Sequence, residues 1–242
     1  MLKFFSFIII LATCILLNSC KKQDNFTSAP LSDYYPLQVG KYITYNLDST
    51  VFIFNKRDTV IKYQVQDRVD SQIVDNIGRP AFMIHRFIRR NATESWLPNN
   101  TFMAVPTENS IEFVENNLRY IKLKLPITEG FTWHGNSYID SYSLNSDLKY
   151  LADWDYTYDS VNVTSSLGSL NVDSTISIAQ RDEFLGEDPG DPGTQYAEKN
   201  YSVERYAKGI GLVFKEFIHW EYQGVDASYT GYGVKLTMID HN

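Results

Sequence analysis

Histidine is the side chain of this sequence best suited to proton transfer or zinc binding near neutral pH. The histidines are His85, His134, His219 and His241, and they lack the paired spacing that zinc sites use. His134 falls in an expected loop, GFTWHG at 130–135, with no cysteine and no close acidic residue beside it. We therefore predict no metal site and assign no catalytic role to these histidines.

Three aspartates in a stretch rich in Tyr and Trp are the candidates for carboxylate chemistry: Asp153, Asp155 and Asp159. Two carboxylates about 5–9 Å apart in a pocket would suit glycoside hydrolysis. Alternating aspartates in a loop are more typical of a solvated edge, so a hydrolase is the alternative hypothesis. A second acidic group, EDPGDPG at 187–193, offers oxygen ligands to calcium, but its spacing differs from an EF-hand and its prolines favour an exposed loop.

Sequence motifs for serine nucleophiles and nucleotide cofactors are missing from this chain. No G-x-S-x-G elbow occurs, and Gly209-Ile210-Gly211 lacks the remainder of a dinucleotide fingerprint. We interpret these glycines as a tight turn between strands, and we expect no cofactor.

The amino-terminal segment is organised around Cys20. Lys3 precedes an apolar run at 4–17, which as a helix would reach about 21 Å, short of the roughly 30 Å of bilayer hydrocarbon. This pattern predicts a signal peptide over 1–19. The following LNSC resembles the lipobox of bacterial lipoproteins, which implies a diacylglyceride on the Cys20 sulfur and a fatty acid such as palmitate on the new amino terminus. An ordinary secreted protein is the alternative.

Residues 20–33, rich in Lys, Asn, Ser and Pro, are predicted to be a lipidated flexible tether, followed by a single β-rich domain at 34–242. Position 21 is Lys, whereas in enteric bacteria Asp there retains lipoproteins in the inner membrane. This favours the outer membrane and leaves the choice between its periplasmic and surface faces open.

Charge and cysteine content limit the partners and the covalent links of the mature chain. Cleavage would leave 21 basic against 29 acidic side chains, which disfavours nucleic acid and gives no polybasic contact with anionic lipid. The membrane affinity must therefore come from acyl chains on Cys20. Cys14 leaves with the signal peptide, so no intramolecular disulfide can form.

The body is predicted to be all-β and mainly antiparallel. Apolar residues alternate with polar ones at 61–70, and further strands are expected near 41–47, 82–88, 101–105, 110–114, 118–125, 172–179, 201–206, 212–222 and 232–239. Turns between strands are expected at Asn55-Lys56, Glu115-Asn116-Asn117 and Gln223-Gly224. Such a meander would curl into a barrel, a half-barrel or a sandwich. At most one or two short helices are expected, one of them within 141–152.

Aromatic residues cluster in WDYTY at 154–158 and in FKEFIHWEY at 214–222. A binding site for a sugar or an apolar ligand is one interpretation, but aromatic rings also suit half-buried strands, and we favour a role in the core. In the second cluster we expect the apolar set to face the core and the polar set to face water. The apolar set is Leu212, Phe214, Ile218, Trp220 and Tyr222, and the polar set is Lys215, His219 and Glu221.

A family resemblance is carried by YYPLQVGKY at 34–42, continued by Tyr45. It is similar to the Y-x-P-L-x-x-G opening of many Bacteroidota lipoproteins of uncharacterised role. Stretches at 125–133 and 206–213 resemble the same group. The resemblance implies an envelope location and an all-β body, and it transfers no catalytic residue.

That lineage O-glycosylates exported proteins at Asp-Ser or Asp-Thr before an apolar residue or Thr, a pattern found at Ser49, Thr59, Ser160 and Ser174. Turns before strands use the same dipeptides. We predict that at least one site is modified. Intact-mass analysis of the mature protein from its native host should show mass beyond lipid and polypeptide, and a mass equal to lipid plus polypeptide would refute the prediction.

Two classes of function follow from the sequence. The preferred one is a non-enzymatic envelope module that binds or assembles with a partner protein, a glycan or an apolar ligand through a rim or concave face of the sheet. The alternative is an envelope hydrolase that acts on glycans through loop carboxylates.

Overall fold

Strands make up most of the part of the chain that the computed structural model describes, residues 28–53 and 56–242. Cys20, the signal segment and Asn55 lie outside these ranges. The first six strands are β1 (Tyr42–Ile53), β2 (Lys56–Val74), β3 (Pro80–Arg89), β4 (Leu97–Pro106), β5 (Ser110–Glu115) and β6 (Leu118–Lys124). The second six are β7 (Thr132–His134), β8 (Asp155–Leu167), β9 (Leu170–Gly186), β10 (Tyr196–Ala207), β11 (Gly211–Gln223) and β12 (Ser228–His241).

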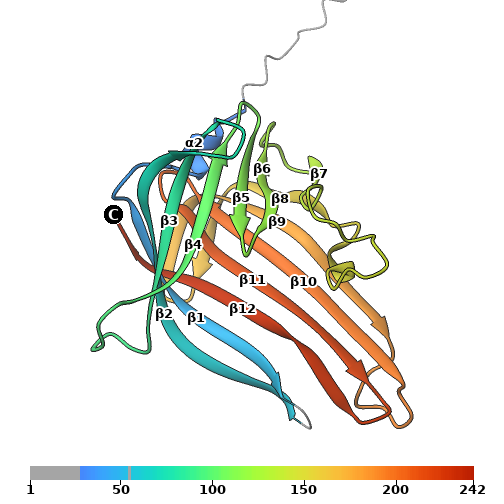
Figure 1. Ribbon diagram of the computed structural model, residues 1–242. Helices are drawn as coiled ribbons and strands as arrows, with labels where there is room; N and C mark the ends of the chain where they lie inside the picture. Colours follow the sequence, from blue (N-terminus) through green and yellow to red (C-terminus); the bar gives the residue numbers. More distant parts are fainter. Residues whose placement is uncertain (1–27, 54–55) are drawn as a thin grey trace, which may run out of the picture.

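All twelve strands belong to one antiparallel sheet in the order β6-β5-β4-β3-β2-β1-β12-β11-β10-β9-β8-β7. Two meanders of six strands are therefore joined where β1 pairs with β12. The sheet curls until its edges meet at one end, where Ile121 N donates to Gly135 O at 2.8 Å and Trp133 Nε1 donates to Ile121 O at 2.8 Å (Figure 1). The predicted all-β class is confirmed, and the form is a nearly closed barrel.

A short helix, α2 (Leu31–Tyr34), covers one end of the curled sheet (Figure 1). Leu31 and Tyr34 are buried there, and Gly209 N donates to Asp33 O at 2.6 Å. The ring of Tyr35 lies 5.9 Å from that of Tyr206. The packed structure thus begins before Tyr34, within the segment expected to be a tether. No helix among the described residues has the length and apolar character needed to span a bilayer.

Two of the predicted turns are present, and both have a positive φ that few residue types accept. Asn116 and Asn117 join β5 to β6 with φ of 51° and 63°, a conformation that Asn tolerates well. Gly209 has φ of 75° between β10 and β11, so the interpretation of these glycines as a tight turn is confirmed. In place of the helix expected within 141–152, the chain forms only the 3₁₀ turn η1 (Lys149–Leu151).

Two expectations about the aromatic stretches are wrong. WDYTY at 154–158 is not a loop, because all but its first residue belong to β8. In β11 the faces are reversed between Phe214 and Trp220: Lys215, Phe217 and His219 face the interior of the curled sheet, opposite Leu236, Val234 and Tyr232 of β12. Leu212 and Tyr222 do not follow this reversal, because Leu212 lines the interior and Tyr222 is buried. Phe214, Ile218 and Trp220 lie on the outer face by alternation. Charged partners from distant strands make this burial of Lys215 possible.

The largest cluster of buried hydrophobic residues among the described residues lies at the closed end of the curled sheet. Trp133 of β7 packs at a ring distance of 4.8 Å from Tyr158 and 5.8 Å from Tyr156, both of β8. These three side chains are almost fully buried. The Tyr158 hydroxyl donates to Lys124 O at 2.8 Å and accepts from Lys124 N at 3.1 Å, which ties β8 to β6. Such contacts fix both edges of the sheet around its interior.

Candidate functional site

Six charged side chains from six different strands face the interior of the curled sheet. We call them the interior charge cluster: Asp67 of β2, Arg86 of β3, Glu115 of β5, Lys122 of β6, Glu204 of β10 and Lys215 of β11. Lys122 Nζ lies 2.6 Å from Glu204 Oε1. Lys215 Nζ lies 3.5 Å from Glu115 Oε2 and 4.0 Å from Glu204 Oε1. Three cations thus oppose three carboxylates.

The third ion pair is bidentate. Arg86 donates to both carboxylate oxygens of Asp67, from Nε at 2.6 Å and from Nη2 at 2.7 Å. This fork geometry is the strongest form of an arginine–carboxylate contact. The two residues stand opposite each other in the β2–β3 ladder, so strand pairing places them together.

Electrostatics favour the charged forms of Glu204, Glu115 and Lys215 in spite of burial, whereas at Lys122 burial outweighs the attraction of Glu204 and lowers the pKa of the ammonium group. Burial alone raises the pKa of the Glu204 carboxyl, but the ammonium groups of Lys122 and Lys215 outweigh it, and the pKa lies below its usual value. Burial likewise opposes ionisation of Glu115, whose pKa is lowered by Lys215 and Arg86. Burial lowers the pKa of Lys215, yet the carboxylates of Glu115 and Glu204 raise it above the ordinary value. The interior is therefore polar, and each of its three cations lies beside a carboxylate.

Neutral phenols complete the polar groups of the interior. The Tyr206 hydroxyl donates to Glu204 Oε2 at 2.7 Å, and the Tyr45 hydroxyl donates to Leu212 O at 2.8 Å. Burial raises the pKa of both tyrosines well above 10, so they act as hydrogen-bond donors at physiological pH.

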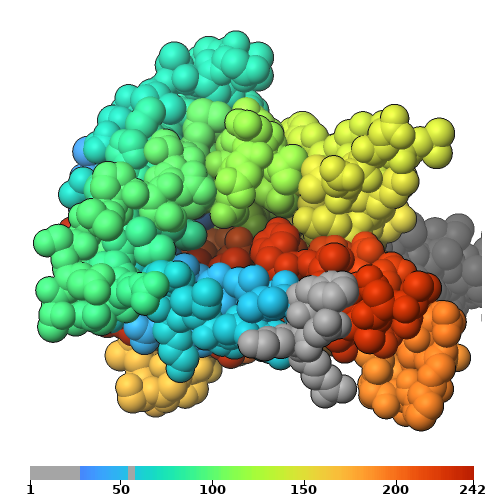
Figure 2. All heavy atoms as spheres, turned by 60° about the horizontal axis from the view of Figure 1, so that its bottom comes forward, coloured from blue at the N-terminus to red at the C-terminus, as the bar shows by residue number. Residues whose placement is uncertain are grey.

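Two cavities flank the interior charge cluster. The first cavity, of about 80 Å³, lies toward the end covered by α2 and is lined by Tyr35, Tyr45, Tyr206 and all six members of the cluster. The second cavity, of about 170 Å³, shares Arg86, Glu115, Lys122 and Lys215 with the first. Figure 2 shows the surface hollowed between the β5–β6 hairpin, in light green, and β11 and β12, in red, strands that also line the second cavity.

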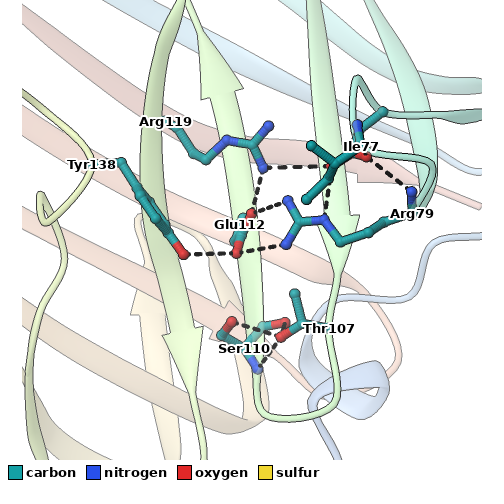
Figure 3. A network of polar contacts seen from close by, with 8 residues as sticks. Ile77, Arg79, Thr107, Ser110, Glu112, Arg119 and Tyr138 are labelled. Carbon is teal, nitrogen blue, oxygen red and sulfur yellow. Dashed lines mark hydrogen bonds and ion pairs between the residues drawn. The ribbon is translucent and has the colours of Figure 1, made fainter.

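A separate polar network lies on the outer face of the sheet (Figure 3). Arg79 donates from Nη2 to Glu112 Oε2 at 2.8 Å and from Nε to Asp75 Oδ2 at 2.8 Å. Arg119 and the Tyr138 hydroxyl also donate to Glu112. Glu112 and Glu115 lie on opposite faces of β5, because three positions separate them. The outer network attaches the β2–β3 turn to β5 and β6, so its role is structural.

In the structure His134 has an acidic partner. Its Nδ1 lies 2.5 Å from Asp155 Oδ1, because the two residues are opposite each other in the β7–β8 ladder. The expectation that no acidic residue lies close to His134 is therefore wrong. Both side chains are more than half exposed, and neither lines the first or second cavity.

The other histidines occupy separate places. His219 is buried on β11, where its Nδ1 donates to Asn200 Oδ1 at 2.8 Å and its ring stacks on Tyr150 at 3.8 Å. Burial lowers its pKa. His85 Nε2 lies 3.7 Å from Asp70, and His241 ends β12. Within the described ranges no three His, Cys, Asp or Glu side chains are grouped as metal ligands would be.

The candidate carboxylates of the hydrolase hypothesis are not gathered around a cavity. Asp153, Asp155 and Asp159 are exposed, and none lines the first or second cavity. Asp153 accepts a hydrogen bond from the Tyr142 hydroxyl at 2.7 Å. The acidic loop at 187–193 is largely exposed, as its prolines indicated.

The possible glycosylation sites lie in strands. Ser49 is in β1, Thr59 in β2, Ser160 in β8 and Ser174 in β9. Thr59 is exposed, whereas the other three are half-buried. Thr59 is thus the site most open to a modifying enzyme, and modification of at least one of the four stays a prediction.

Comparisons with known proteins add two structural neighbours. No protein-family model matches the chain, and no curated protein matches it. A Bacteroides fragilis protein described as exported and as having a YmcC-like fold is 12% identical, with a TM-score of 0.40 over 86% of this chain and 99% of that one. A Parabacteroides distasonis protein described as a lipoprotein is 12% identical, with a TM-score of 0.32 over 86% and 98%.

Proposed function

We propose that the protein is a lipoprotein of the bacterial cell envelope, anchored through Cys20, and that it is a non-enzymatic module that binds a small molecule inside its curled sheet. The observation that carries the binding role is the interior, where ionised side chains surround two cavities. Replacing buried ion pairs by apolar side chains of similar volume is often neutral or stabilising. Because apolar side chains could fill the same space, a bound ligand accounts for the polar character of this interior.

The arrangement of the fold is compatible with an amino-terminal anchor. The helix α2 begins at Leu31, eleven positions after Cys20, and it lies at the covered end of the sheet (Figure 1). Lipid on Cys20 would hold this covered end toward the membrane. The outer membrane is part of the proposal because Lys21 occupies the position after the lipidated cysteine.

The binding role predicts a bound molecule in protein isolated from the native host. Denaturing the purified lipoprotein should release a small molecule in near-stoichiometric amount, detected by mass spectrometry. Val234→Phe adds a ring to the wall of the second cavity and should strongly reduce the released amount. Val51→Phe adds the same ring at an exposed position of β1 and should leave it unchanged. Absence of a stoichiometric molecule, or equal release from all three chains, would contradict the proposal.

A further inference from the structure

The second cavity contains a buried hydrogen-bond donor without a partner. Gln180 of β9 is 3% exposed, and its Oε1 accepts from Ser202 Oγ at 2.6 Å. Its Nε2 has no hydrogen-bond partner anywhere in the described residues, although Gln180 lines the second cavity. Gln180 Nε2 exposes less than 1 Å², so a small turn of the amide toward the cavity would let an acceptor atom there satisfy the unpaired N–H groups.

Aromatic rings form the walls around this donor. The two aromatic clusters of the sequence meet here, with Trp154 of the first and Phe217 of the second 6.0 Å apart between ring centroids. Tyr120, Tyr156 and Tyr232 also line the cavity. Trp154 and Tyr156 are buried, whereas Tyr232 is 46% exposed. The site therefore has a buried polar floor at Gln180, walls that contain aromatic rings beside the charged groups, and an accessible side at Tyr232.

Volume and charge restrict the ligand further. The cavity of about 170 Å³ is comparable to an engineered cavity of about 150 Å³ that holds benzene, so a single ring fits. Each cation on its wall already faces a carboxylate, so a charged ligand would bring an uncompensated charge into the interior. A ligand that displaces water from the ammonium and carboxylate groups on the wall must nevertheless carry polar atoms that take the place of that water.

We infer that the second cavity binds a neutral, polyhydroxylated molecule of single-ring size, such as a pyranose sugar. One ligand oxygen accepts from Gln180 Nε2, other hydroxyls contact the Lys122, Lys215 and Glu115 side chains, and the C–H face of the ring packs on Trp154 and Phe217. This assignment rests on the proposed function and names the ligand class for the same interior.

Isothermal titration calorimetry with the full chain, in a detergent that lacks a sugar headgroup, tests the inference. The probes are glucose, galactose and N-acetylglucosamine, compared with benzyl alcohol and benzoate as neutral aromatic and anionic rings of similar size. At least one pyranose should bind, and Gln180→Leu should weaken it about tenfold, as loss of one buried hydrogen bond does. Gln195→Leu, at an exposed position, should leave the affinity unchanged.

Ser202→Ala provides a second variant in case Gln180→Leu does not fold. Without the Ser202 hydroxyl the Gln180 amide is no longer fixed, so pyranose affinity should again fall, and a circular dichroism melt checks that the variant is folded. The inference is overturned if no pyranose binds, if only benzyl alcohol or benzoate binds, or if neither variant weakens pyranose binding. Release of a molecule without a polyhydroxylated ring from the native lipoprotein would overturn it too, while leaving the proposed binding function intact.

Discussion

Glu204→Leu is expected to lower the free energy of unfolding by about 3–5 kcal/mol, the usual cost of removing one partner of a buried ion pair. Glu204 is 1% exposed and lies 2.6 Å from Lys122 Nζ and 4.0 Å from Lys215 Nζ. Leucine would leave the Lys122 ammonium buried without a counter-ion and the Tyr206 hydroxyl without its acceptor. Urea unfolding at pH 7, followed by the β signal in circular dichroism, measures the loss.

Two companion variants separate the ion pair from the general effect of a lost carboxylate. Glu204→Leu combined with Lys122→Met removes both charges and should recover much of the loss, because apolar pairs can replace buried ion pairs. Glu216→Leu breaks a solvent-exposed pair with Lys235, at 3.6 Å, and should cost less than about 1 kcal/mol. Equal losses for Glu204→Leu and Glu216→Leu would show that the interior charge cluster is not a coupled, buried system.

The same carboxylate predicts a pH dependence with a definite sign. The pKa of Glu204 is lowered in the folded protein, so it contributes stability above the unfolded value of about 4.3. That contribution is lost as the pH falls from there through the lowered folded pKa. As the pH is lowered from 7 to 3, the free energy of unfolding should therefore fall more steeply for the wild-type protein than for Glu204→Leu.

Cys20→Ala is expected to abolish lipid attachment and membrane anchoring, since the thiol is the only acceptor for the diacylglyceride. Two or three acyl chains bind a membrane stably, at roughly 0.8 kcal/mol per buried methylene, whereas one chain binds only marginally. Wild-type protein from its native host should enter the detergent phase of a Triton X-114 separation. The variant should accumulate as uncleaved precursor, be degraded, or be released into the aqueous phase after cleavage elsewhere.

Cys14 supplies the matched control for this experiment. It lies inside the apolar run at 4–17, so Cys14→Ala should leave processing and phase partitioning unchanged. Intact mass should show acyl chains on the wild-type protein and on Cys14→Ala, and none on Cys20→Ala. Wild-type protein that stays in the aqueous phase with a free, sequenceable amino terminus would refute the lipoprotein assignment.

Sequence patterns determined the class of the fold and several of its turns. The alternation of apolar and polar residues at 61–70 indicates that one face of the strand is buried. This inference does not require the partner strand to be known. Local backbone preference likewise identified the turns at Asn116-Asn117 and at Gly209, because few residue types accept a positive φ. The length of the signal segment and the motif at Cys20 are also local features. The lipoprotein prediction therefore rests on the sequence alone and does not depend on the fold of the body.

Only the tertiary structure decided which face of β11 is buried and what the interior contains. The local sequence pattern predicts a solvent-facing Lys215 because its counter-ion, Glu115, is 100 positions away in the chain. Lys122 and its partner Glu204 are likewise 82 positions apart. The aromatic clusters around Trp154 and Phe217 meet for the same reason. Closure of the sheet sets these distances, and a charged side chain becomes a stable interior residue only when the closed sheet delivers an opposite charge to it.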